Sequence, residues 1–205
     1  MNPEELQSAL RRIESETDPN ARALLLAAVV SEAFRAEGFE PVGVGGSAIE
    51  FYTDGAYMSG DVDICWTGSR IPTPADQGRV MASLGAPRGG PRSWKWEGHF
   101  FDLLGPAEVY AKHDFARMTT PLGQVVLQPV EDLLVERVFA ARCWTGPNPS
   151  AEDCARKLLA SALRGGIDVD WSEVERVAAL PAYDCLAVVI AMKQEVEASL
   201  APDAK

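Results

Sequence analysis

The sequence predicts an α/β fold, in which a mixed sheet is flanked by helices and followed by a C-terminal helical bundle. Two observations carry this prediction. Short apolar stretches separated by glycine-containing turns run to residue 128, and from Pro129 onward the apolar periodicity is helical throughout. A chain of 205 residues has room for a small α/β domain with a helical annex. We therefore expect one domain at 1–128, including N-terminal helices, and a helical region at 129–205.

Two helices are predicted before the first strand. Residues 3–17 place apolar side chains on one stripe, which is typical of a surface helix. Asp18 is suited to cap the second helix and Pro19 to occupy its first turn. Gly38 marks the end of this second helix, because glycine readily adopts the left-handed conformation found there.

Strands and short helices then alternate. The expected order is a strand at 41–46, a helix at 47–53, a strand at 61–66, a helix at 74–85, a strand or hairpin at 93–105 and further strand material at 108–128. The helices expected beyond them cover 129–144, 150–166, 170–180 and 186–200.

Composition excludes several classes of function. The formal net charge of −11 argues against broad, salt-driven binding of nucleic acid. A local basic patch at Arg88, Arg92 and Lys95, among glycines and two tryptophans, is either a solvated loop or a rim that contacts phosphates or bases. Four dispersed cysteines and two histidines lack the spacing of a zinc site or a disulfide framework. The acidic, polar start is not a signal peptide, and no apolar run is long enough to cross a bilayer, so we expect a cytoplasmic protein without a membrane partner.

A glycine-rich turn after the first predicted strand has three interpretations. Gly43, Gly45 and Ala48 satisfy the dinucleotide-binding pattern G-x-G-x-x-A. The segment from Ser47 to Asp61 holds only one short helix and then a glycine-broken loop, however, and a Rossmann crossover needs a longer helix and more βα units. A metal-dependent phosphate site and a plain structural turn are the other two interpretations.

Three aspartates favour the phosphate site. Asp61 and Asp63 are two residues apart on a predicted strand, so both point to the same side, where they repel each other unless a cation lies between them. Asp102 lies in a strand that is otherwise apolar, where a charge is costly unless it is paired or bound to metal. Carboxylate oxygens are the ligands that Mg²⁺ takes together with phosphate oxygens.

These motifs resemble the DNA polymerase β-type nucleotidyltransferase superfamily, whose pattern is a Gly-Gly/Ser turn, an acidic pair on the next strand and a third acidic residue on a later strand. The matching residues are Gly45-Gly46-Ser47, Asp61-Val62-Asp63-Ile64 and Asp102. The helical sequence after Pro129, with Arg137, is similar to small bacterial nucleotidyltransferases that include AbiEii-like toxin components. The resemblance covers roughly residues 40–160.

The resemblance implies an enzyme that transfers a nucleoside monophosphate from an NTP, such as ATP, to a hydroxyl acceptor. Asp61, Asp63 and Asp102 would be its catalytic residues and would hold Mg²⁺ or Mn²⁺. The acceptor stays open between RNA such as a tRNA end, a protein and a small molecule, and a cognate antitoxin is a further expected partner. The alternative from another class is a catalytically inactive nucleotidyltransferase-fold module with a binding or regulatory role.

The same resemblance implies a nucleotide-binding set. Gly45, Gly46 and Ser47 would hold the β- and γ-phosphates, through close backbone approach, a helix N-terminus and a hydroxyl donor. Arg137 has two interpretations, a phosphate contact or an arginine that snorkels or pairs with another helix. Lys157 is a further candidate for the triphosphate.

The Asp-Val-Asp tripeptide occurs a second time, at Asp168–Asp170. This copy lacks the preceding glycine–serine turn and leads directly into a predicted helix. Asp170 and Glu173 have the spacing of a helix cap, so we interpret this copy as structural.

Overall fold

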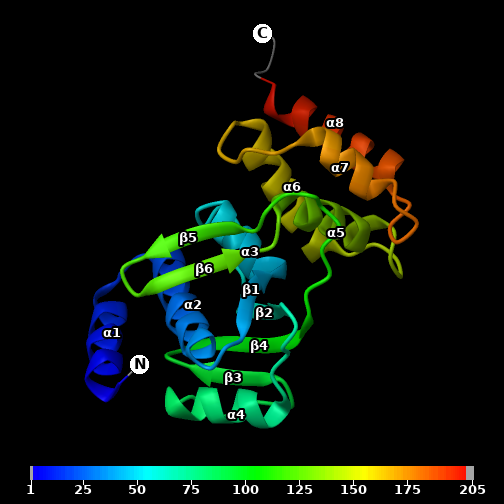
Figure 1. Cartoon of the computed structure of the whole chain (residues 1–205). Helices are drawn as coiled ribbons and strands as arrows, with labels where there is room; N and C mark the ends of the chain where they lie inside the picture. Colours follow the sequence, from blue (N-terminus) through cyan, green and yellow to red (C-terminus); the bar gives the residue numbers. More distant parts are fainter. Residues whose placement is uncertain (1, 202–205) are drawn as a thin grey trace. The chain divides into compact units, whose positions relative to one another are not determined.

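The fold is described from a computed structural model, for residues 2–201 (Figure 1). Contacts within the chain define two compact units. The sheet unit comprises residues up to 51, 58–108 and 115–128, and the helical unit comprises residues 52–57, 109–114 and those from 129 onward. Among residues 2–201, no helix combines the length and the apolar character that crossing a membrane requires.

The sheet unit contains six strands and the first four helices. They are α1 (Pro3–Ser15), α2 (Pro19–Ala36), β1 (Glu40–Val44), α3 (Gly45–Tyr52), β2 (Asp61–Thr67), α4 (Pro74–Ser83), β3 (Ser93–Trp96), β4 (His99–Pro106), β5 (Ala116–Thr120) and β6 (Gly123–Leu127). The strand order is β3-β4-β2-β1-β6-β5. The β1–β6 and β2–β4 pairs are parallel and the other pairs antiparallel, so the predicted mixed sheet is confirmed.

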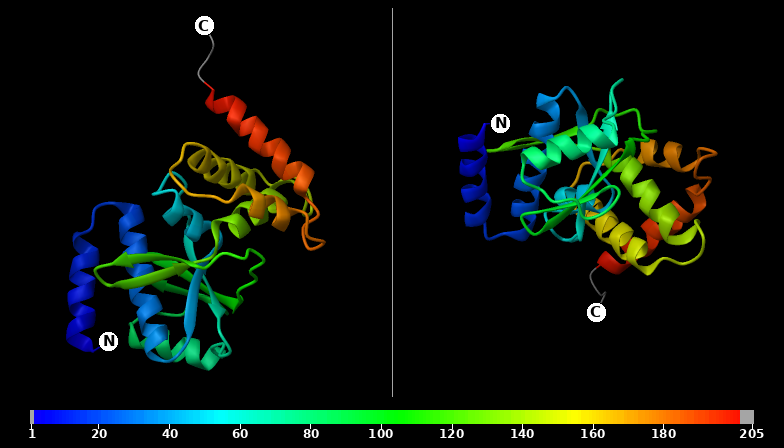
Figure 2. Two further views of the ribbon diagram at one scale, coloured as in Figure 1. Left: turned by 45° about the horizontal axis from the view of Figure 1, so that its top comes forward. Right: turned by 90° about the horizontal axis from the view of Figure 1, so that it is seen from below.

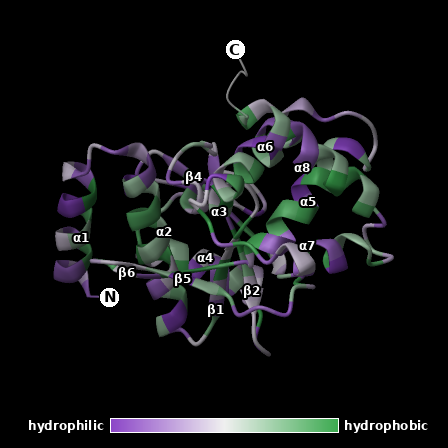
Figure 3. Cartoon of the chain, turned by 90° about the horizontal axis from the view of Figure 1, so that it is seen from above, coloured by the Kyte–Doolittle hydropathy of each residue, from purple (hydrophilic) through white to green (hydrophobic). Residues whose placement is uncertain are grey.

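The N-terminal helices begin where their capping residues predict. The Asn2 side chain and Glu5 form a reciprocal capping box at the start of α1. The Asp18 side chain accepts a hydrogen bond from the Ala21 amide, and Pro19 opens α2, as predicted. Gly38 follows the end of α2 with φ of +80°. The outer helix α1 runs beside α2 (Figure 2), and α2 is mostly hydrophobic because it lies against the sheet (Figure 3).

Along β2, buried side chains alternate with partly exposed ones, so that one face of the strand belongs to the core and the other carries the aspartates. Val62, Ile64 and Trp66 are buried, and the intervening side chains are partly exposed. The Trp66 ring lies 4.7 Å from that of Phe34 on α2, centroid to centroid, and Phe39 packs against both. This side of β2 therefore faces α2, and the opposite side is left to the aspartates.

The helical unit contains α5 (Val130–Arg142), α6 (Pro149–Leu163), α7 (Trp171–Ala178) and α8 (Leu186–Leu200). Buried carboxylates attach the segment 109–114 to these helices. Asp132 accepts hydrogen bonds from the amides of Tyr110 and Ala111, and Glu173 accepts one from Lys112. The Glu195 carboxylate on α8 binds Arg142 on α5 and Arg156 on α6, which joins three helices at their surface.

Candidate functional site

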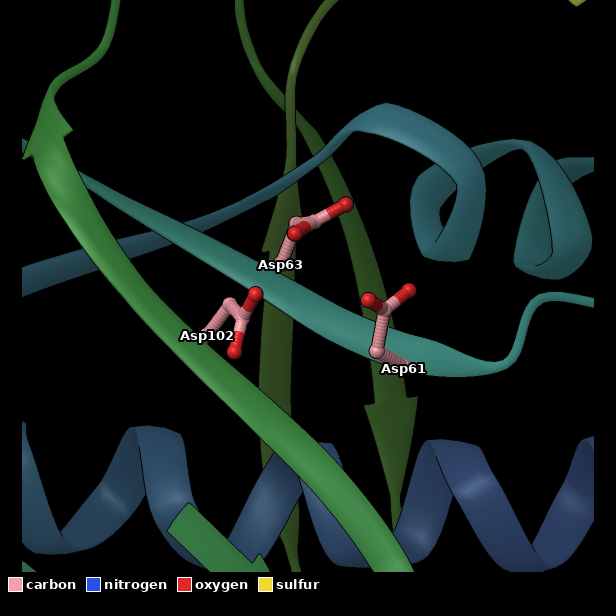
Figure 4. Close-up of side chains that lie close together, drawn as sticks. All are labelled: Asp61, Asp63 and Asp102. Carbon is pink, nitrogen blue, oxygen red and sulfur yellow. The ribbon is translucent and has the colours of Figure 1, made fainter. Parts of the chain in front are cut away.

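The structure brings the three predicted aspartates together on one face of the sheet. Asp61 and Asp63 project from β2, and Asp102 is the register partner of Asp63 on the parallel strand β4 (Figure 4). Each carboxylate offers an oxygen such that the three oxygens lie within 4.8 Å of one another. All three side chains are partly exposed, so the cluster is accessible to solvent and ligands.

This donor set fits a hard divalent cation. Mg²⁺ and Ca²⁺ bind carboxylate oxygens at about 2.0 to 2.6 Å, so oxygens around one ion are separated by at most about twice that distance. The 4.8 Å spread of the three oxygens is compatible with this range. Three carboxylates at this spacing repel one another, and a bound cation is the simplest compensation. The residues therefore fit Mg²⁺ or Mn²⁺, and no histidine or cysteine takes part in the cluster.

Two serines outside the predicted site hold two of these carboxylates. The Ser93 hydroxyl on β3 donates to Asp102, its register partner, and the Ser59 hydroxyl donates to Asp61 at 3.3 Å. The position of Ser93 beside Asp102 follows from the register of the β3–β4 hairpin. Glu97 and Gly98 both have positive φ, as in a two-residue hairpin turn, and this turn sets Ser93 opposite Asp102. Glu-Gly is a weak turn signal, which explains why the sequence left this segment open between a strand and a hairpin.

The glycine turn is connected to the aspartate cluster through Ser47. The helix α3 begins at Gly45, whose φ of +61° favours glycine. Gly46 is buried in the first turn, and Ser47 is 1% exposed. The Ser47 hydroxyl donates to the Val44 carbonyl at 3.1 Å and accepts from the Asp63 amide at 3.1 Å. By accepting from the Asp63 amide, this hydroxyl orients the start of β2. Because its single proton is already donated to Val44, the donors left for a phosphate in this turn are the backbone amides at the start of α3.

Glu50 is a buried carboxylate that sequence reasoning missed. It is 3% exposed and accepts a hydrogen bond from the Ser59 amide at 2.6 Å. Burial raises the pKa of Glu50, and the hydrogen bond from Ser59 opposes this shift. Since Ser59 also contacts Asp61, Glu50 fixes the segment that enters β2.

The two predicted cationic contacts lie in the helical unit. Arg137 on α5 pairs with the adjacent Glu136 at 3.1 Å, so this ion pair lies within α5. Its Nε atom is buried and has no hydrogen-bond partner within residues 2–201. Lys157 on α6 pairs with Asp153 at 2.9 Å, and its ammonium lies 5.7 Å from the centroid of the Tyr57 ring. A nucleotide contact by either side chain stays a prediction.

The two tryptophans of the predicted basic patch are part of the core. Trp94 and Trp96 are 2% and 3% exposed, so both indoles belong to the core and neither is available to stack on a base. The exposed aromatic side chain of this hairpin is Phe100, at 45%. Arg88 donates to the carbonyls of Gly90 and Pro91 and so closes the loop before β3.

Comparison with known proteins identifies the architecture. No protein-family model and no curated protein sequence matches the chain. Among solved structures, the antibiotic-resistance factor ANT(2'')-Ia in solution is 12% identical, with a TM-score of 0.51 over 89% of this chain and 96% of its own. An antigenic nucleotidyltransferase-like protein from Paracoccidioides brasiliensis is 11% identical, with a TM-score of 0.52 over 86% of this chain and 94% of its own.

The fold is nucleotidyltransferase-like. At these identities the likeness shows the fold alone, and it confirms the predicted fold class of a mixed sheet with flanking and C-terminal helices. In this nucleotidyltransferase-like fold, Asp61, Asp63 and Asp102 lie together on two central strands.

Proposed function

We propose that the protein is a Mg²⁺-dependent nucleotidyltransferase, which moves a nucleoside monophosphate from an NTP to a hydroxyl acceptor. One observation carries the proposal, namely the convergence of Asp61, Asp63 and Asp102 on one face of the sheet. The Ser47 hydrogen bond to the Asp63 amide supports it, because it joins the glycine turn to the same cluster. The nucleotidyltransferase-like fold is consistent with this reaction class.

Each side chain of the cluster has a defined task in this proposal. Asp61, Asp63 and Asp102 would hold Mg²⁺ or Mn²⁺, which when bound neutralises charge on the phosphates and supplies Lewis acidity at the α-phosphate. Ser59 and Ser93 keep two of the carboxylates in place. The backbone amides of Gly46 and Ser47 at the start of α3 receive the phosphates, because unpaired amides at a helix N-terminus attract anions.

The chemical step exchanges a phosphoanhydride bond of the NTP for a phosphate ester bond to the acceptor. The oxygen of the acceptor hydroxyl bonds to the α-phosphorus, and the bond from that phosphorus to the oxygen bridging to the β-phosphate breaks. Pyrophosphate leaves with the electron pair of that bond. The hydroxyl proton passes to the Asp102 carboxylate, the cluster member that hydrogen-bonds to the outer strand β3.

The proposal is tested by incubating the protein with α-labelled NTPs, Mg²⁺ and a cell lysate, and following label transfer and pyrophosphate release. Both should depend on the divalent cation and stop on chelation. Calorimetry with Mg-NTP separates the outcomes. A folded protein that neither binds Mg-NTP nor releases pyrophosphate contradicts the proposal, and binding without any transfer indicates an inactive nucleotide-binding module.

Arg137 and Lys157 are proposed as additional contacts to the NTP phosphates. Arg137 supports this role through its buried Nε without a partner in residues 2–201, since a buried donor of this kind is costly unless a ligand satisfies it. Replacing Arg137 with Gln should raise KM for the NTP. The AbiEii-like subgroup, a cognate antitoxin and a cytoplasmic location stay predictions from the sequence.

A further inference from the structure

The face of the sheet that carries the aspartates continues onto Phe100 and Lys95. Strand register places Asp61 on β2 opposite Phe100 on β4, and Phe100 opposite Lys95 on β3. Register partners point to the same side of a sheet, as do residues two apart on one strand. Phe100 therefore has three neighbours on this face of the sheet. They are Asp61 on the adjacent strand β2, Lys95 on the adjacent strand β3 and Asp102 further along β4 itself.

Phe100 is exposed where a plain sheet surface would carry a polar residue. It is 45% exposed, whereas its strand neighbours Phe101 and Leu103 are fully buried on the other side. A single exposed apolar residue is common on protein surfaces. Here the ammonium of Lys95 also lies 5.6 Å from the centroid of the Phe100 ring, which forms a cation–π pair. The pair presents a flat apolar ring and a positive charge beside the aspartate cluster.

On the other side of Asp102, β4 borders a cavity that contains arginines. Leu103 and Leu104, which follow Asp102 directly, line this cavity of about 290 Å³ together with Arg88 and Arg92. In the described part of the chain, no carboxylate lies within ion-pair distance of Arg88, Arg92 or Lys95. Asp102 thus lies on β4 between an aromatic ring with its lysine and a cavity with two arginines.

From this arrangement we propose that Phe100 and Lys95 form an acceptor platform that selects a nucleotide-like acceptor, with a flat ring and a phosphate group near its reacting hydroxyl. The inference rests on the proposed function, because it takes Asp102 as the group that receives the acceptor proton. The ring would stack on Phe100, and the phosphate would be met by Lys95 or by the arginines of the cavity.

The same charges exclude a polycationic acceptor. When Asp61, Asp63 and Asp102 hold a divalent cation, it offsets their charge, and Lys95 beside Phe100 and the two arginines of the cavity lie close to β4 as positive charges. Like charges across an interface oppose binding. An amine-rich sugar should therefore be a poor acceptor for this protein.

The test compares four acceptors that differ in whether they carry an aromatic base, a phosphate group, both, or several positive charges. They are the 5′-phosphorylated dinucleotide pApA, adenosine without phosphate, glycerol 3-phosphate without a ring, and the polycationic aminoglycoside tobramycin. Transfer of label from α-labelled ATP is measured for the wild type, Phe100→Leu and Lys95→Gln. Lys193→Gln is the matched control, because Lys193 also forms a cation–π pair, with Trp171, but on α8 of the helical unit.

We expect pApA to be the best of the four acceptors and tobramycin to give no transfer above background. Phe100→Leu should lower kcat/KM for pApA roughly ten-fold, as loss of one base-stacking contact does. Lys95→Gln should lower it by about as much, because a charge-assisted contact to the phosphate is lost. KM for ATP should stay unchanged in both variants, and Lys193→Gln should behave as wild type. A structural role of Phe100 or Lys95 would instead lower all activities together.

Three results overturn the inference: tobramycin exceeding pApA, no labelling of any of the four acceptors, or unchanged kcat/KM for pApA in both variants. Mg-ATP binding by calorimetry and slow hydrolysis of ATP to AMP are measured alongside, since neither needs an acceptor. If both persist, only the acceptor class is wrong. If both are absent, the proposed function fails and this inference fails with it.

Discussion

The chain contains the tripeptide Asp-Val-Asp twice, and the two copies have different structures. At Asp61–Asp63 it opens β2, with Val62 buried and both carboxylates on the opposite face. At Asp168–Asp170 it precedes α7, where the Asp170 side chain accepts hydrogen bonds from the amides of Ser172 and Glu173. The first pair of carboxylates converges with a third, whereas Asp168 is exposed and Asp170 is used as a helix cap.

The difference shows that the neighbouring sequence decides what two nearby carboxylates do. The first copy follows the turn at Gly45–Ser47 and enters a strand, so its alternation aligns the carboxylates. The second copy is followed by Trp171 and a helical pattern, so its last carboxylate is used by the backbone. The Asp170 carboxylate is held by protein groups, because it caps α7 and the His113 ring contacts it at 3.3 Å.

The largest expected effect is a loss of nucleotidyl-transfer activity when the first Asp-Val-Asp copy is changed but not when the second is. Asp63→Asn should lower nucleotidyl transfer by at least about a hundred-fold, because it removes a charged ligand from the site where phosphate charge is neutralised. The isosteric change leaves the strand intact. The matched control Asp168→Asn should retain wild-type transfer. Equal activities of the two variants in the same pyrophosphate-release assay would remove the functional distinction between the copies.

The next largest effect is expected on divalent-cation affinity when Ser93, which donates a hydrogen bond to Asp102, is replaced. Ser93→Ala should weaken divalent-cation affinity by about ten-fold, the lower end of the range for losing a residue that orients a metal ligand. Thr at the same position should restore it, because it keeps a hydroxyl. Unfolding temperature is the control measurement. A variant that loses stability but keeps its affinity for Mn²⁺ would show that Ser93 is structural only.

A smaller effect is expected at the second copy, and in stability rather than activity. Asp170→Ala removes the cap of α7 and should lower the free energy of unfolding by about 1 kcal/mol. Transfer activity should be unchanged. Denaturant unfolding of this variant beside Asp168→Asn gives the comparison, and an Asp170→Ala protein as stable as the wild type would mean that the cap contributes nothing.

The smallest effect concerns a carboxylate that already has protein partners. Hydrogen bonds from Arg142 and Arg156 lower the pKa of Glu195 from its usual 4.5 to about 2. A lowered pKa means that the pairing stabilises the fold above pH 4.5, and that this contribution is lost as the pH falls toward 2. Glu195→Gln should therefore show a shallower loss of stability over this interval. Parallel acid-unfolding curves for variant and wild type would contradict the assignment.

Much of this architecture could be read from local patterns. Asp18 and Pro19 predicted the start of α2, and alternation around Val62 placed Asp61 and Asp63 on one side. The cost of a charge in an apolar strand indicates that Asp102 belongs to the same metal site. The strand order that makes Asp102 and Asp63 neighbours depends on long-range pairing, which no local pattern encodes.

Other parts of the site depend on tertiary contacts and were missed for that reason. Ser47 was expected to donate to phosphate, but its hydroxyl is engaged by Val44 and Asp63 across the turn. Ser93 and Glu50 became visible only when the hairpin register and the burial of α3 were known. The alternation of Trp94, Lys95 and Trp96 is that of a half-exposed strand, and in β3 both indoles are buried while Lys95 between them is exposed.

The most direct test of the account is the binding of Mn²⁺ to the folded protein in the presence of a non-hydrolysable ATP analogue, followed by electron paramagnetic resonance. We predict that the wild type and Asp168→Asn bind the ion alike, and that Asp61→Asn, Asp63→Asn and Asp102→Asn each bind it at least about ten-fold more weakly. Undiminished Mn²⁺ binding by a protein carrying all three of these asparagine substitutions would contradict the account.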